Sequence, residues 1–318
     1  MKHAFPVADS GLDPLAPTIF HESWWLDAAS RGRYEIVEAR RDGKRAAWLP
    51  TFTRRRFGVS TNLPPRLVHF LGPAVYPGEG DVAARAYVRA ALTRELAAAL
   101  PRGIIHSYKC DRFCGDVVGF QLEGFSTGLQ FTHELAPAPV DMVWRAMRKK
   151  KRSQIRRAQA SLRVAPIEDG EVFARFYARM QEAQGRPDYY RGEPVAALAD
   201  ESLARGRASL LGAYDAKGAL VAAAWIVRDR ASAYYFMAAR AADAHDGAAS
   251  LLVWKAIEGA SARGLAFDFG GVSTPQSVAF FAGFGGAPVP RVRLARAQGL
   301  HRAIWALRER LRPHSHLC

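Results

Sequence analysis

The feature that most constrains the fold is a strand, loop, helix and strand in succession between residues 232 and 271. Residues 232–237 form an aromatic, apolar run typical of a strand, and residues 265–269 form a second, shorter one. Between them, four apolar residues recur at helical spacing: Leu252, Ala256, Ile257 and Ala260. This pattern predicts a βαβ unit, in which the two strands are parallel and the crossover is right-handed.

The loop before the predicted helix, residues 244–250, consists mainly of small residues. Gly247, Ala248 and Ala249 would let backbone N–H groups and the positive end of the helix approach an anion closely. The loop is therefore a candidate phosphate cradle. It has neither the P-loop lysine nor the dinucleotide-binding glycine pattern, so a loop that holds no ligand is the alternative interpretation.

A series of short motifs lies in a fixed order within residues 145–290. They are a basic segment (152–158), a leucine-rich helical run (251–257), Arg263-Gly264-Leu265, Asp268-Phe269-Gly270-Gly271 and a final run at 280–286. This order resembles the FemABX-like branch of the GNAT acyltransferase superfamily. The resemblance implies an α/β (α+β) fold of tandem GNAT-like domains, each a mixed sheet flanked by helices. In the usual GNAT pyrophosphate loop, Q/R-x-x-G-x-G/A, the first position is basic or an amide, whereas this chain has Ala244 there.

Length and repetition also predict two domains. A chain of 318 residues exceeds one typical domain, and we place the boundary between residues 1–139 and 140–318. The hairpin signal at Asp42-Gly43 in the first half is matched by Asp215 to Gly218 in the second, which indicates an internal duplication. The second domain would carry the acyl-donor site and end in an amphipathic helix with four leucine or isoleucine residues: Leu300, Ile304, Leu307 and Leu311.

The chain is strongly basic, with a formal net charge of +15. Such a charge attracts nucleic acid, nucleotide-linked substrates and anionic membrane surfaces. Part of it lies on a predicted helix that begins at Asp141 and continues to residue 162. Arg152 and Arg156, one turn apart, could grip a substrate phosphate, as the resemblance favours. A solvated face and an RNA-binding patch are the alternatives.

Acyl transfer to an amine requires a held carbonyl and a stabilised oxyanion. The GNAT resemblance implies that the strand through Phe236, Met237 and Ala238 splays from the strand containing Asp268, so that freed backbone N–H groups hold the acyl group. Asp268 is the carboxylate nearest to that gap, as a base or as the group that orients the amine. Alternatively, Asp268 caps a turn with Gly270.

Several further residues are candidates for contacts with the reactants. Tyr234 and Tyr235 could protonate the leaving group, and we expect one of them to face the core. Gly270 would permit close backbone approach to a substrate, unless it serves only a turn. The aromatic, turn-rich loop around Tyr189 and Tyr190 could close over a substrate, or it could be a surface loop with a buried tyrosine.

Together these observations predict an N-acyltransferase that acts by direct attack of an amine on an activated acyl group. The donor is acyl-CoA, with aminoacyl-tRNA as the alternative, and the acceptor is an envelope-glycan precursor or a nucleotide-linked sugar. A non-catalytic protein that binds polyanions or nucleic acid is the alternative of another class. We expect no metal, no transmembrane segment and a cytoplasmic location, peripheral to the inner face of the membrane if the C-terminal helix contacts lipid.

Overall fold

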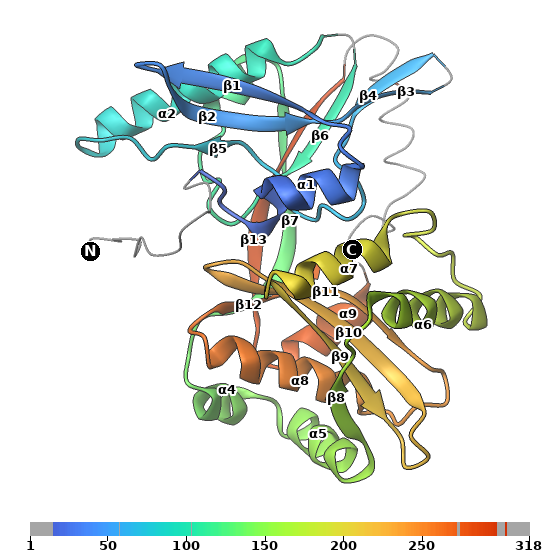
Figure 1. Cartoon of the computed structure of the whole chain (residues 1–318). Coiled ribbons are helices and arrows are strands. Elements are labelled where there is room, and N and C mark those ends of the chain that lie inside the picture. The colour runs from blue at the N-terminus through green and yellow to red at the C-terminus, as the bar shows by residue number, and fades with distance from the viewer. Residues whose placement is uncertain (1–14, 57, 103, 272–273, 298–302, 304–318) are drawn as a thin grey trace.

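The computed structural model describes residues 15–56, 58–102, 104–271, 274–297 and 303, and the predicted C-terminal amphipathic helix lies outside them (Figure 1). The first half contains η1 (Ile19–His21), α1 (Ser23–Ser30), β1 (Glu35–Arg41), β2 (Lys44–Thr51), β3 (Thr53–Arg56), β4 (Val59–Asn62), β5 (Ala74–Val75), α2 (Val82–Ala99), β6 (Ile105–Lys109), α3 (Val118–Leu122) and β7 (Ser126–Leu135). β1 and β2 form the predicted hairpin, and Asp42 and Gly43 both take the positive φ that a two-residue turn requires.

The second half contains α4 (Val140–Ala146), α5 (Lys149–Ser161), β8 (Arg163–Pro166), α6 (Gly170–Ala183), α7 (Val195–Ala204), β9 (Ala208–Tyr214), β10 (Leu220–Arg228), β11 (Ser232–Arg240), α8 (Ala248–Ser261), β12 (Ala266–Gly271), α9 (Pro275–Ala282) and β13 (Ala287–Arg296). The predicted βαβ unit is β11, α8 and β12, and its two strands are parallel. Strands β9, β10 and β11 form the expected antiparallel meander.

Two sheets organise the described residues. The smaller one has the strand order β1-β2-β5, and the larger one runs β3-β4-β6-β13-β7-β12-β11-β10-β9-β8. The larger sheet is mixed, because β4 pairs with β6 and β11 with β12 in parallel while its other neighbours are antiparallel. This architecture confirms the predicted α/β fold with helices flanking a mixed sheet.

Two hydrophobic cores lie on opposite faces of the β8–β12 part of the large sheet. Helices α6, α7 and α1 cover one face, where the side chains of Trp225 and Phe236 are buried. Helices α8, α5 and α4 cover the other face, where Phe267 and Phe269 are buried (Figure 1).

Strand β13 joins the two halves of the chain. It lies between β6 and β7 in the large sheet, although it comes from the end of the described chain (Figure 1). The pairing with β7 runs from Ala287↔Glu134 to Ala295↔Ser126. A strand of the second half therefore completes the sheet of the first, and the boundary at residues 139 and 140 stays a prediction.

The prediction of one continuous basic helix over residues 141–162 is wrong. It is two helices, α4 and α5, separated by an extended Met147 and Arg148. The predicted N-cap is also wrong: Pro139 occupies that position, and Asp141 lies in the first turn, where it pairs with Arg145. No helix within the described residues combines the length and apolar character that crossing a membrane requires.

Candidate active site

The parallel ladder between β11 and β12 is short. It comprises three pairs, from Ser232↔Ala266 to Tyr234↔Asp268. Beyond them β11 continues to Arg240 alongside β10, whereas Gly271 of β12 pairs with Thr132 of β7. The two strands therefore part after Tyr234, as predicted, and among the described residues the β12-facing edge of β11 has no ladder partner over residues 235–240.

A bulge in β11 lies at the point where the strands part. Tyr235 is opposite Ile226 and Met237 is opposite Trp225, so Phe236 is the additional residue. A bulge bends its strand and increases the local twist, which directs β11 away from β12. It also turns both Phe236 and Met237 toward the α6 core, where the Phe236 ring lies 4.8 Å from the Trp225 ring. Phe236 and Met237 can therefore contact an acyl donor only through their backbone atoms.

A cavity of about 240 Å³ opens along this free edge of β11. It is lined by residues from both faces of the sheet: Gln181, Gln184, Arg186, Ala223, Tyr235, Ala238, Ala239, Arg240, Ala249 and Leu252. Tyr235, Ala238 and Ala249 are predicted site residues, and the structure brings them together here. Because the parted β12 leaves the edge of β11 uncovered, one cavity can contact both the α6 side and the α8 side.

The small residues before α8 have a packing role. A Cβ atom on Gly247 would lie 2.7 Å from the Gln154 carbonyl oxygen and 2.9 Å from Ala158 Cβ, so α5 packs directly against this glycine. Gln154 Nε2 also donates to the Asp246 carbonyl at 3.0 Å. Gly247 and Ala248 do not line the cavity, and Ala248 is buried. Close contact with α5 explains why this loop needs a small side chain at Gly247.

Lys151 of α5 reaches the first turn of α8. Its Nζ donates to Ser250 Oγ at 3.0 Å and lies 4.1 and 4.8 Å from the Phe280 and Phe284 ring centroids. Burial lowers the pKa of Lys151 to about 8, although the Asp246 carboxylate acts in the opposite direction. A lysine from α5 thus lies at the first turn of α8, close to the loop in which Ala244 replaces the basic or amide residue of the usual GNAT motif. Its distance from that loop in sequence hid it from motif analysis.

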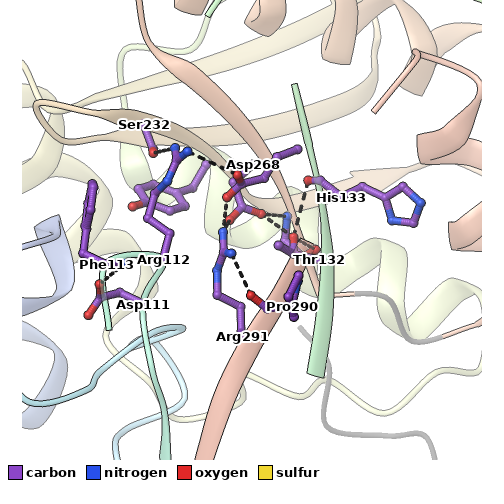
Figure 2. A network of polar contacts seen from close by, with 12 residues as sticks. Asp111, Arg112, Phe113, Thr132, His133, Ser232, Asp268, Pro290 and Arg291 are labelled. Carbon is purple, nitrogen blue, oxygen red and sulfur yellow. Dashed lines mark hydrogen bonds and ion pairs between the residues drawn. The ribbon is translucent and has the colours of Figure 1, made fainter. Parts of the chain in front are cut away.

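Asp268 belongs to a buried polar network between the two halves of the chain (Figure 2). Its Oδ1 accepts hydrogen bonds from the Thr132 hydroxyl and from the Gly270 N–H at 2.8 Å. Its Oδ2 lies 3.2 Å from Arg291 Nη2, which also binds Glu134. The side chain projects from the face of β12 opposite Phe267 and Phe269. Asp268 therefore caps the turn at Gly270, which is the second of the two roles predicted for it.

The same network contains charged residues that sequence analysis missed. Arg112 Nη2 lies 3.4 Å from Glu134 Oε2, and Arg112 Nη1 donates to Ser232 Oγ at 3.0 Å (Figure 2). Burial and the Asp268 carboxylate raise the pKa of Glu134, although Arg291 and Arg112 oppose this. Glu134 lies in β7 directly opposite Asp268. Only the sheet register brings these distant residues together.

The two tyrosines of β11 have different environments. Tyr234 is buried and donates to Asp229 Oδ2 at 2.8 Å, and burial raises its pKa well above the usual value. Tyr235 lies on the opposite face, toward α8, and lines the cavity. Tyr234 is therefore the one that faces the core, and Tyr235 remains the candidate proton donor.

The predicted substrate-binding residues lie apart from the cavity. Arg152 Nη1 donates to the carbonyls of Arg145 and Met147 at 2.8 and 2.6 Å, so it caps the end of α4. The Arg156 guanidinium lies over the Trp144 ring at 5.4 Å. The structure does not bring the two arginines together as a clamp, because Arg152 is held by α4 carbonyls.

The predicted aromatic loop packs against the first half of the chain. Tyr190 is buried, and its hydroxyl lies 2.9 Å from His69 Nε2. The Tyr189 carbonyl accepts a hydrogen bond from Arg66. Gly270 has a φ of 78°, which favours glycine, and a Cβ there would lie 3.4 Å from the Tyr235 carbonyl oxygen. Gly270 therefore borders the gap, whereas the two loop tyrosines do not line it.

Residues 145–276 match the family described as an acetyltransferase (GNAT) domain. Residues 145–276 are therefore a GNAT domain, which supports the prediction of an acyltransferase. No match was found among curated proteins.

The crystal structure of FemX shares the fold of almost the whole chain. The superposition covers 90% of this chain and 93% of the FemX chain, with a TM-score of 0.66 and 13% identity. L-PGS from Bacillus licheniformis has a TM-score of 0.54 at 13% identity, over 90% of this chain and 91% of its own. The C-terminal domain of a putative lysylphosphatidylglycerol synthetase from Agrobacterium fabrum has a TM-score of 0.52 at 14% identity, over 89% of this chain and 90% of its own. The domain match thus confirms the resemblance to the GNAT superfamily for residues 145–276, and the FemX structure shows that almost the whole chain shares its fold.

Proposed function

We propose that this chain is an N-acyltransferase whose donor enters the gap between β11 and β12 and whose acyl group passes to an amine. The observation that carries the proposal is the cavity along the free edge of β11, at the point where the ladder with β12 ends. An unpaired strand edge offers backbone N–H groups that can hold a carbonyl and its developing oxyanion without any particular side chain. The backbone of Phe236, Met237 and Ala238 would serve as this anchor.

The reaction that we propose is direct attack. The amine nitrogen attacks the acyl carbonyl, a C–N bond forms, and the bond from the carbonyl to the leaving thiol or alcohol breaks. Tyr235 donates its proton to the leaving group and then regains the proton that the attacking amine loses, which is consistent with its place in the cavity lining. Asp268 acts as a positioning residue, because its bonds to Gly270 and Thr132 hold β12 where it turns away from β11.

For the donor we favour acyl-CoA. The α8 wall of the cavity is narrow and apolar, with Ala238, Ala249 and Leu252, which suits an uncharged pantetheine arm. Gly247, Ala248 and Ala249 at the start of α8, together with Lys151, would lie near its phosphates. The proposed acceptor is the amine of an envelope-glycan precursor or a nucleotide-linked sugar, with Arg156 as a surface contact for its phosphates.

An aminoacyl-tRNA is the second candidate donor. The observation in its favour is the exposed cationic surface of α5 and the residue before it: Arg148, Lys149, Lys150, Arg156 and Arg157. Such a surface could hold an RNA backbone while the aminoacyl ester enters the gap. A location in the cytoplasm, with peripheral contact to the membrane, remains part of the proposal.

The test is a variant that fills the gap. Ala238→Phe should weaken acetyl-CoA binding at least about tenfold, because the ring would occupy the donor channel. Ala160→Phe on the exposed face of α5 is the matched control and should bind CoA as the wild type does. Calorimetry would measure the affinity for CoA. A filter-binding assay at two salt concentrations would measure the affinity for a tRNA minihelix. If Ala238→Phe binds CoA as tightly as the wild type, CoA does not bind in the gap. If Ala238→Phe weakens binding of the minihelix, aminoacyl-tRNA is favoured as the donor.

A further inference from the structure

The cavity has a second wall that the donor would not occupy. This wall, here called the α6 wall, consists of Gln181, Gln184 and Arg186, with Ala223 and Ala239 as its floor. Ala223 and Ala239 are directly opposite each other on β10 and β11 and face α6. The cavity lining contains Arg186 and Arg240 and no acidic residue. A ligand in this cavity therefore meets positive charge and amide groups.

Hydrogen bonds hold the backbone around Arg186. The Arg186 N–H donates to the Gln181 carbonyl at 2.9 Å, across a turn at Gly185 with a φ of 61°. Gln184 Nε2 donates to the Arg240 carbonyl at 2.6 Å, which ties the end of α6 to the end of β11. Glu182 and Asp188 are near in sequence, but within the described part of the chain no carboxylate forms an ion pair with Arg186.

Arg240 differs from Arg186 in its surroundings. Its Nη1 donates to the Ala244 carbonyl at 3.1 Å, in the loop that leads to α8. Arg240 therefore belongs to the donor side of the cavity, and Arg186 is the cation of the α6 wall. An arginine fork binds a carboxylate through two parallel hydrogen bonds, which gives it geometric selectivity as well as charge.

The side chains of the α6 wall indicate what it can bind, since they are one arginine and two amides. We propose that the acceptor carries a carboxylate close to its reacting amine, as a free amino acid or the end of a peptide does, and that Arg186 binds this carboxylate. This proposal rests on the proposed acyl transfer, since it assigns the α8 wall to the donor and leaves the α6 wall to the acceptor. It replaces the sugar amine proposed above by the amine of an amino acid or peptide.

Binding of matched ligands tests the proposal without turnover. Glycine, alanine and glutamate would each be compared with the corresponding amide, glycinamide, alaninamide and isoglutamine, by ligand-observed NMR with the full chain in saturating CoA. The carboxylates should bind about 10- to 100-fold more tightly than the amides, which corresponds to one charge-assisted hydrogen-bonded pair. Arg186→Gln should abolish this difference, Arg186→Lys should restore part of it, and Arg191→Gln, on the same connection but outside the cavity lining, should leave it unchanged.

The outcomes separate this proposal from the proposed function. Equal binding of acids and amides by the wild type overturns the carboxylate proposal, even if CoA binds as expected. A loss of CoA affinity in Arg186→Gln, without any effect on the acids, also overturns it, because the arginine would then serve a donor phosphate. If Arg186→Gln abolishes carboxylate-selective binding but the protein does not bind CoA, the carboxylate site is supported and acyl-CoA is contradicted as donor.

Discussion

Replacing Gly247 by alanine tests why the loop before α8 consists of small residues. The new Cβ would lie 2.7 Å from the Gln154 carbonyl oxygen and 2.9 Å from Ala158 Cβ, and real Cβ contacts are essentially never that short. Because the nearer atom belongs to the α5 backbone, relief requires a shift of the whole helix. Overpacking of this kind costs about 1–3 kcal/mol. The φ of Gly247 is −91°, so backbone strain contributes nothing to the expected loss.

A second glycine in the same helix is the matched control. The nearest atom to a Cβ on Gly259 would be Arg263 Nη1 at 3.7 Å, which is an ordinary contact. Gly259→Ala should therefore stabilise the protein by about 0.5–1 kcal/mol, the usual gain in a helix interior. Urea unfolding followed by circular dichroism would measure both variants. If Gly247→Ala is as stable as Gly259→Ala, α5 does not need the glycine, and the explanation of the loop by packing is refuted.

Three further predictions concern the gap and its surroundings. Asp268→Ala should destabilise the protein by about 3–5 kcal/mol, because it leaves Arg291 with one partner fewer in a buried network. If urea unfolding is unchanged and turnover is lost, Asp268 would instead be favoured as a catalytic base. Tyr235→Phe should lower kcat about 100-fold or more without a change in stability, and an unchanged kcat at saturating donor would exclude it as the proton donor. Trace acylation of Lys151 should rise with a midpoint near pH 8, since burial lowers the pKa of its amine to about that value. Peptide mass spectrometry that finds Lys151 still unreactive well above pH 8 would contradict the effect of its burial.

The second half of the fold could be predicted because its signals are local. The alternation of apolar runs in residues 232–271 predicts the β11-α8-β12 unit, and parallel strands follow from the length of the crossover. The parting of β11 and β12 was implied by the family resemblance. Its physical cause, the bulge at Phe236, was not apparent, because a bulge in an apolar strand leaves no sequence pattern.

The polar network and the α6 wall could not be predicted, because they depend on distant pairings. Arg291 meets Glu134 only because β13 returns between β6 and β7, and these residues are 157 positions apart. The continuity of the basic helix was overestimated for a related reason. Helical periodicity continues through Met147 and Arg148, but both residues are extended, and Arg152 satisfies the carbonyls at the end of α4.

The central claim is that the free edge of β11 holds the acyl donor. Hydrogen–deuterium exchange of the full chain, with and without saturating acetyl-CoA, tests this claim most directly, because the N–H groups facing the gap change their exchange rates when they bind a carbonyl. We expect donor-dependent protection in peptides covering residues 235–240 and the first turn of α8, with no change in β9. Protection confined to the α5 surface, or absent from residues 235–240, would contradict the claim.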